Sequence, residues 1–367
     1  MLRPSRIIGL IASVLSVLVV AAPASAQSGE KSAILPIRTD GPKNLDPAKG
    51  STTYDNMACS QLYETLLISK YTDPMEMEPL LLTEMPTSED GGLTWNFKLK
   101  PGVMFHDDEC FPGGKGREMV AEDVLYSIRR LADPRYEYEN WWLIDNTILG
   151  FNDYKNKFVG SQNFSYDEPV EGFRIINDHE FEIVLVEPVY RFLYVLSMFQ
   201  TSVVPREAVE MYGEDFSFNP VGTGPFLLED FIPKKHLKLV RNPNYHEVLY
   251  PAEDEWTSED RRNRLHRAAG QRVPFLDRLE FRMFVEDQPM WLRFSEGTIG
   301  YTEVPAEYYE QAFDPRTKRL KPEMRRSGVR DHSNALLDFI FRGFNMEDPL
   351  VGGYSEEKKA LRQAINL

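Results

Sequence analysis

Cysteine is almost absent from this sequence, which holds only Cys59 and Cys110 among its 367 residues. No C-x-x-C spacing occurs, so the sequence lacks the common redox motif and the cysteine pairs of typical zinc sites. In an exported protein the two cysteines can form one disulfide, and the alternative is two buried free thiols. Sequence separation gives no geometry, so both alternatives stay open.

Long apolar runs are also scarce. The sequence has one, near the N-terminus, at 7–22. Arg3 and Arg6 flank its start, and an A-x-A cleavage signature follows at 24–26. These features predict a cleavable signal peptide at 1–26, with an N-terminal membrane anchor as the alternative. The absence of a cysteine near the cleavage point argues against a lipid anchor. We therefore expect a soluble mature chain that is exported to the periplasm.

Motifs for catalysis and for cofactor binding are missing as well. The GGKG run at 113–116 lacks the spacing and the Ser or Thr of a P-loop. The run His-Asp-Asp-Glu at 106–109 could ligate a metal, but consecutive residues do not converge easily on one ion. Neither H-E-x-x-H nor G-x-S-x-G occurs. We expect no cofactor, no metal and no catalytic residue, and a hydrolase with scattered catalytic residues is the rival from another class.

Basic residues are outnumbered, since 57 acidic residues against 42 lysines and arginines give a formal charge of −15. Such a charge argues against nucleic acid and against anionic membranes as partners. One stretch departs from this balance, because residues 250–273 are poorly periodic and contain RRNRLHR at 261–267. A solvated surface loop is the main interpretation, and a phosphate or nucleic-acid patch is the alternative.

Alternating apolar residues are present in several segments and predict strands. The strands and hairpins are expected at 93–99, 173–185, 226–239 and 279–283. With 42% hydrophobic residues the chain can bury a sizeable core, and its length suggests about two domains.

Helical periodicity lies between these strands. A period of 3.6 residues predicts a helix over 120–131 and a shorter one around Leu62 and Leu66. The final residues, 358–367, form an amphipathic helical pattern for which Ser355 is a plausible N-cap. Strands and helices in alternation indicate an α/β or α+β protein of more than one lobe.

Four segments carry motifs in a fixed order. They are LDPAKGSTTYDNMACSQLYETLL at 45–67, GLTWNFKLKPGVMFHDD at 92–108 followed by AEDVLYSIRRLADP at 121–134, VGTGPFLLEDFIPKKHLKLVRNPNY at 221–245, and FNMEDPLVGGYSEEKKALRQAIN at 344–366. Together they resemble the family 5 extracellular solute-binding proteins of ABC importers, the oligopeptide-, dipeptide- and nickel-binding group. The chain departs from the family pattern at 109–120 and 250–273, where longer links are expected to form surface loops.

The resemblance implies an α/β, bilobed periplasmic-binding-protein type II fold with an extra domain, as in the peptide-binding cluster. Its hinged lobes would close over a buried ligand. The implied division is a signal peptide at 1–26, the first part of lobe I at 27–74, the extra domain II at 75–200, the second part of lobe I at 201–284 and the start of lobe III at 285–367. The chain would cross between lobes near Pro205 and at 284–287.

The resemblance also implies a function without catalysis. The protein would capture peptides in the periplasm, as a monomer, and deliver them to ABC transporter permease subunits in the inner membrane. The loop after LDP would face the cleft, so Ser51, Thr52, Thr53 and Tyr54 are the predicted ligand contacts. An ordinary polar loop is the alternative for these four residues, and a metal chelate, a sugar or an opine is the alternative ligand.

The last matching helix, at 358–366, lies well before the C-terminus in the family. We therefore expect lobe III to be incomplete in this chain. An incomplete lobe would expose apolar surface, so the chain alone is expected to bind peptide weakly and to aggregate.

Overall fold

The computed structural model describes residues 29–136, 139–161, 164–331 and 343–366. The chain divides into two compact units, one ending at Glu303 and the other beginning at Val304. The signal peptide predicted at 1–26 lies outside the described residues. Within the described part, no helix has both the length and the apolar character that crossing a membrane requires.

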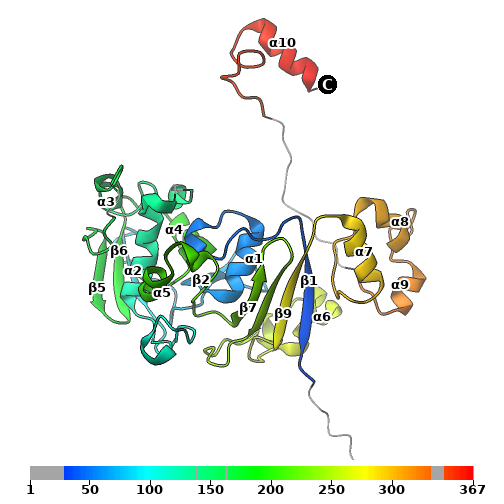
Figure 1. Ribbon diagram of the computed structural model, residues 1–367, viewed down its shortest axis with the longest axis horizontal. Helices are drawn as coiled ribbons and strands as arrows, with labels where there is room; N and C mark the ends of the chain where they lie inside the picture. The colour runs from blue at the N-terminus through cyan, green and yellow to red at the C-terminus, as the bar shows by residue number, and fades with distance from the viewer. Residues whose placement is uncertain (1–28, 137–138, 162–163, 332–342, 367) are drawn as a thin grey trace, which may run out of the picture. The chain divides into compact units, whose positions relative to one another are not determined.

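A four-stranded sheet organises the first unit (Figure 1). Its strands are β1 (Ser32–Arg38), β7 (Phe226–Ile232), β8 (His236–Arg241) and β9 (Arg278–Phe284), in the order β1-β9-β8-β7. β1 pairs with β9 in parallel, whereas β7–β8 and β8–β9 are antiparallel. The predicted strands at 226–239 and 279–283 are confirmed. β1 joins them from a distant part of the sequence.

The two faces of this sheet differ in chemistry, because successive side chains of a strand point to opposite sides. One face buries Leu237, Leu239 and Phe281 in the hydrophobic core. The opposite face carries Lys238 and Glu280, which are paired across β8 and β9 and are only half-buried. The sheet therefore has one core face and one charged face.

A second, three-stranded sheet contains β4 (Thr94–Lys98), β5 (Phe173–Asn177) and β6 (Glu180–Val184) in the antiparallel order β4-β6-β5. This arrangement confirms the predicted strand at 93–99 and the predicted hairpin at 173–185. Phe97 and Phe181 are opposite residues of this sheet, and their rings stack with centroids 4.8 Å apart. Alternation in the sequence placed both rings on the same, buried face.

The predicted helix over 120–131 is confirmed as α2 (Ala121–Arg129), followed by a 3-10 turn at 130–132. Asp123, in its first turn, accepts a hydrogen bond from the Val120 amide, which satisfies a free amide of the helix start. Just past the helix, Arg130 is fully buried and pairs with Asp46 at 2.7 Å. This ion pair joins the LDP loop to the end of α2.

The shorter helix predicted around Leu62 and Leu66 is α1 (Thr53–Leu62), which ends four residues earlier than expected. Leu66 is buried outside the helix, and its carbonyl accepts hydrogen bonds from the Leu80 and Leu81 amides. The prediction failed at this end because a strand-like pairing with a distant segment replaced the next helical turn.

The first unit contains several shorter elements besides these. They are β2 (Leu67–Ser69), β3 (Met77–Pro79), α3 (Phe151–Lys157), α4 (Arg191–Val195), α5 (Arg206–Tyr212), α6 (Ser258–Asn263) and α7 (Asp287–Ser295). The stretch at 250–273 exposes its arginines, as a surface loop would, and it contains α6. It is anchored by Trp256, which is buried and packs against Tyr71 and Tyr250.

The second unit contains α8 (Tyr309–Ala312), α9 (Pro322–Arg326) and α10 (Glu356–Ile365). α10 confirms the predicted final helix, and the hydroxyl of Ser355 accepts a bond from the Lys358 amide as the predicted N-cap. Arg362 donates to the carbonyls of Val351 and Gly353, which ties the preceding loop to the helix.

Both cysteines are free thiols. Cys59 is buried in α1, and Cys110 is partly buried in the loop before α2. The sequence left a disulfide and two free thiols open as alternatives. The structure has two free thiols and no disulfide between Cys59 and Cys110.

Candidate functional site

Three strands of the four-stranded sheet end at one edge, which we call the carboxyl edge. β1 ends there at Arg38, β7 at Ile232 and β9 at Phe284, since all three strands run in the same direction. The Thr39 amide donates to the Phe284 carbonyl at 3.0 Å and extends the pairing of β1 with β9 by one residue. Ligands of α/β proteins bind outside the carboxyl ends of parallel strands, so this edge is the first candidate.

Arg38 is the charged centre of the carboxyl edge. Its guanidinium forms an ion pair with Asp287, the first residue of α7, and lies 3.7 Å from the Glu303 carboxylate. The hydrogen bond to Asp287 raises the pKa of Arg38, and Tyr54 also interacts electrostatically with it. We call these four residues the Arg38 cluster. It links the end of β1, the start of α1 and the start of α7.

The predicted ligand contacts lie at the start of α1, and the structure gives them different roles. Thr53 and Tyr54 are its first two residues, Thr52 is its N-cap and Ser51 precedes the cap. The Thr52 hydroxyl caps the helix by accepting from the Asp55 amide at 3.1 Å. The side chains of Ser51 and Thr53 are exposed, and Tyr54 belongs to the Arg38 cluster. Ligand contact by the four residues stays a prediction, and Tyr54 lies nearest to the charged centre of the edge.

Asp55 organises this loop and was missed in the sequence. Its carboxylate is buried and accepts bonds from the amides of Lys43, Ser51 and Thr52 as well as from the Thr52 hydroxyl. A Thr-x-x-Asp spacing is the signature of a capping box, so this residue could have been found from the sequence. Because Asp55 uses the amides of Ser51 and Thr52, those two groups are occupied within the protein.

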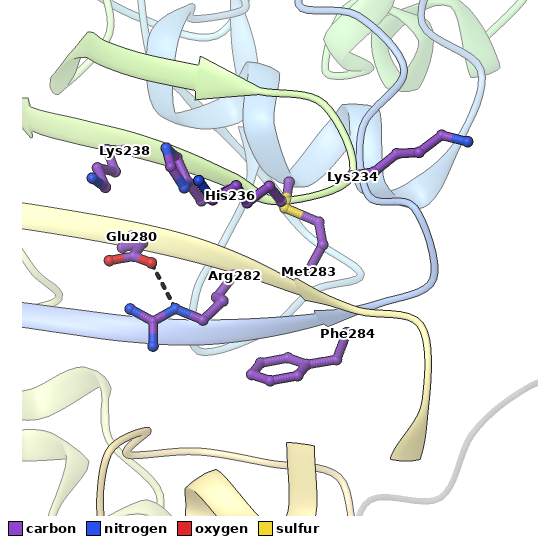
Figure 2. A pocket seen from close by; sticks show the side chains of 8 residues that line it. Lys234, His236, Lys238, Glu280, Arg282, Met283 and Phe284 are labelled. Carbon is purple, nitrogen blue, oxygen red and sulfur yellow. Dashed lines mark hydrogen bonds and ion pairs between the residues drawn. The ribbon is translucent and has the colours of Figure 1, made fainter. Parts of the chain in front are cut away.

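A hollow of about 480 Å³ lies beside the carboxyl edge, at the turn between β7 and β8 (Figure 2). We call it the hairpin hollow. It is lined by Lys234, Lys235, His236, Lys238, Glu280, Arg282, Met283 and Phe284. Within it, Arg282 donates to Glu280 at 2.7 Å, and His236 Nε2 lies 2.5 Å from an oxygen of Asp230. The sequence indicated only a turn at 233–235, because the hollow depends on pairing between β8 and β9.

A buried carboxylate joins two of the four segments that carry the family resemblance, 45–67 and 221–245. Glu64 is 3% exposed, and it accepts bonds of 2.8 Å from the Thr223 hydroxyl and from the Tyr245 hydroxyl. His246 Nε2 lies 2.9 Å from both carboxylate oxygens. Burial and the neighbouring carboxylate raise the pKa of Tyr245, so its hydroxyl keeps its proton and donates. We call these four residues the Glu64 network.

Three side chains of the metal-capable run at 106–109, those of His106, Asp107 and Asp108, are engaged with separate partners. His106 is buried, donates from Nε2 to the Gly224 carbonyl at 3.0 Å and accepts from the Gly222 amide at Nδ1. Burial lowers the pKa of His106 to about 4, so the ring is neutral. Asp107 pairs with Lys115, and Asp108 accepts from the Tyr212 hydroxyl. Among the described residues, no group of three or more His, Cys, Asp or Glu side chains is placed to hold a metal ion.

Comparison with known proteins gives relatives for most of the chain. Di/tripeptide-binding protein 2 of Pseudomonas aeruginosa is 26% identical over 236 residues, which are 63% of this chain and 42% of that protein. Heme-binding protein A of Haemophilus influenzae is 27% identical over 199 residues, which are 53% of this chain and 33% of that protein. The chain thus spans less than half the length of these relatives.

Solved structures share the fold. The periplasmic binding protein DppA from Helicobacter pylori, in complex with peptide STSA, matches with a TM-score of 0.57 and 21% identity, over 77% of this chain and 49% of that one. This similarity confirms the predicted α/β fold, that of the bilobed periplasmic binding proteins. The model of the bacterial extracellular solute-binding proteins, family 5 Middle, matches residues 76–367. The chain therefore belongs to the family 5 bacterial extracellular solute-binding proteins, as the motifs in its sequence predicted.

Proposed function

We propose that this protein is the substrate-binding component of an ABC importer, which captures peptides in the periplasm and delivers them to permease subunits in the inner membrane. The observation that carries this proposal is the family match over residues 76–367, together with a relative named as a di/tripeptide-binding protein. The protein acts as a monomer, without a cofactor and without catalysis of its own. A signal peptide at 1–26 directs its export.

The carboxyl edge is the proposed place of capture. A peptide has backbone donors and acceptors along its length and a charge at each end, and the edge offers polar groups of both signs. Arg38 supplies a fixed positive charge between two carboxylates, and the hydroxyls of Ser51, Thr53 and Tyr54 lie at the adjoining loop. Peptides held in this way bind mainly through main-chain hydrogen bonds, which gives broad specificity.

We propose for this chain the division into lobes that the family resemblance implies. The first part of lobe I at 27–74 and its second part at 201–284 contribute the strands of one sheet, β1 and β7 to β9. Domain II occupies 75–200, and lobe III begins at 285, two residues before α7 begins at Asp287. In such proteins the lobes close because ligand contacts exist only in the closed state.

The test is native mass spectrometry of the protein isolated from the periplasm of the cells that make it. Calorimetric titration with trialanine follows. A series of peptide masses and saturable binding would support the proposal. Ser51→Ala and Thr53→Ala should then weaken binding, while Lys31→Ala at the opposite edge of the sheet should not. Release of cleaved peptide under the same conditions would support a hydrolase instead and contradict the proposal.

The second candidate keeps the fold and changes the ligand to a non-peptide molecule such as a metal chelate, a sugar or an opine. The observation that favours it is the relative named as a heme-binding protein. One small non-peptide mass in the native spectrum, with no response to trialanine, would select this candidate.

A further inference from the structure

We propose that the hairpin hollow binds an organic carboxylate. This site stands on the charges and the shape of this chain and does not depend on whether the protein captures peptides. Its lining reverses the charge balance of the protein. Of the eight lining residues, Lys234, Lys235, Lys238 and Arg282 are cationic and only Glu280 is acidic. The whole chain carries a net charge of −15.

The ion pairs inside the hollow do not neutralise all of its cationic side chains. The Arg282 guanidinium donates to Glu280 at 2.7 Å, as Figure 2 shows, so the one lining carboxylate is already taken. Lys234 lies 3.2 Å from Asp40, and in Figure 2 its side chain extends away from the other labelled residues. Lys235 and Lys238 form no ion pair within 4 Å with any described residue. Both act on the Asp230 carboxylate from a longer distance, because the pKa of Asp230 is lowered mainly by its bond to His236 and further by Lys238 and Lys235. Since neither lysine is paired directly with a carboxylate, both ammonium groups are available to an anion from solution.

Lys238 is the stronger of the two candidates for anion contact. It stands on the charged face of the sheet, half-buried between His236 and the Glu280–Arg282 pair, whereas Lys235 is exposed at the turn. A charge that is partly withdrawn from water interacts more strongly with an opposite charge, because the surroundings screen it less. The backbone fixes Lys235 at the end of β9, since the Lys235 carbonyl accepts from the Met283 amide at 3.0 Å.

Apart from His236, the remaining lining residues are the apolar Met283 and Phe284, and they favour an organic anion over an inorganic one. Met283 and Phe284 are consecutive residues of β9, so their side chains point to opposite faces of the sheet. Phe284 is half-buried at the end of β9 and shares the charged face with Lys238. A carboxylate attached to a short hydrocarbon chain can place its charge on Lys238 and its methylene groups against Phe284. The volume of about 480 Å³ is in the range of small-molecule sites.

The experiment uses the full chain and three probes: glutarate, inorganic phosphate and the neutral analogue glutaramide. Binding is followed by calorimetry and by the assigned imidazole resonances of His236, which lines the hollow. Glutarate should shift the His236 resonances saturably, phosphate should bind more weakly, and glutaramide should leave them unchanged. Phosphate binding as tight as glutarate, or an equal response to glutaramide, would overturn the assignment to an organic carboxylate.

Matched lysine variants distinguish binding at the hairpin hollow from a general electrostatic attraction of glutarate to the protein surface. Lys238→Gln should weaken glutarate binding about fivefold, the effect of one unit charge at about 4 Å in water. Lys235→Gln should weaken it less, because its side chain is more exposed. Lys31→Gln removes the same charge at the far end of β1 and should have no effect. Equal weakening by Lys31→Gln and Lys238→Gln, with unchanged thermal melting of each variant, would overturn the proposal.

Discussion

The Glu64 network and the Arg38 cluster are both built around a single charged side chain, yet they differ in their exposure to water. Glu64 is 3% exposed and surrounded by hydroxyl and imidazole donors from distant segments. Arg38 keeps 39% of its side chain exposed and faces carboxylates that water also reaches. A buried charge must be fully satisfied by the protein, whereas an exposed one can exchange its partner for water or for a ligand. The first arrangement suits stability, and the second suits binding and movement.

The largest expected effect is the removal of the buried carboxylate. Glu64→Ala would leave the hydroxyls of Thr223 and Tyr245 and the ring of His246 without their shared partner. We expect a loss of about 3 kcal/mol or more in the free energy of unfolding, measured by urea denaturation. Glu64→Gln keeps the shape and one acceptor, so it should cost less. A loss below about 1 kcal/mol for Glu64→Ala would contradict the role given to this network.

The second largest effect also comes from a buried residue. His106 makes the free energy of unfolding depend on pH. Burial lowers its pKa from 6.5 to about 4 in the folded protein. Between these values the unfolded chain binds a proton that the folded chain does not, so stability falls as the pH decreases from 6.5 to about 4. The loss from this residue is about 3 kcal/mol, and above pH 6.5 it disappears.

The His106 contribution can be isolated by comparison with His106→Gln, which cannot titrate in this range. Unfolding midpoints of the two proteins should differ in their slope between pH 4 and 6.5. Identical slopes for wild type and variant would show that His106 is not the source of the pH dependence.

The start of α1 separates a structural residue from predicted ligand contacts. Thr52→Ala removes the cap that receives the Asp55 amide, and we expect a loss of about 1 kcal/mol in unfolding free energy. Ser51→Ala and Thr53→Ala change exposed side chains and should stay within about 0.5 kcal/mol of wild type. If all three variants lose the same unfolding free energy, Thr52 does not differ from Ser51 and Thr53 in its structural role.

The smallest effect is expected at the Arg38 cluster. A double-mutant cycle of Arg38→Gln and Asp287→Asn should give a coupling below about 1 kcal/mol, because both side chains are partly exposed. Thermal denaturation of the four proteins measures it. A coupling as large as the loss in Glu64→Ala would erase the distinction between the two regions.

Elements with a clear period were predictable from the sequence. Alternation placed Phe97 and Phe181 on one face of their sheet, and the 3.6-residue period located α2 and α10. β1 was missed, because most of its side chains are half-buried on both faces and its sequence shows no clean alternation. The end of α1 was misplaced where the chain pairs with a distant segment.

The polar sites were much less predictable than the elements. Motif order led to the family and to the loop at 51–54, and the Thr-x-x-Asp spacing would have led to Asp55. Nothing local in the sequence connects Glu64 to Tyr245, or Lys238 to Glu280. Each of these pairs forms only when strands or loops far apart in the chain are brought side by side.

The sequence by itself determined the alternation of strands and helices, the family and the acidic character of the chain, because these depend on local periodicity, fixed motifs and composition. The tertiary structure alone decided that Cys59 and Cys110 form no disulfide, that Glu64 joins two distant segments and that four cations line the hairpin hollow. Pairing between distant segments sets these distances, and burial then sets which charges must be neutralised and which remain available for a ligand.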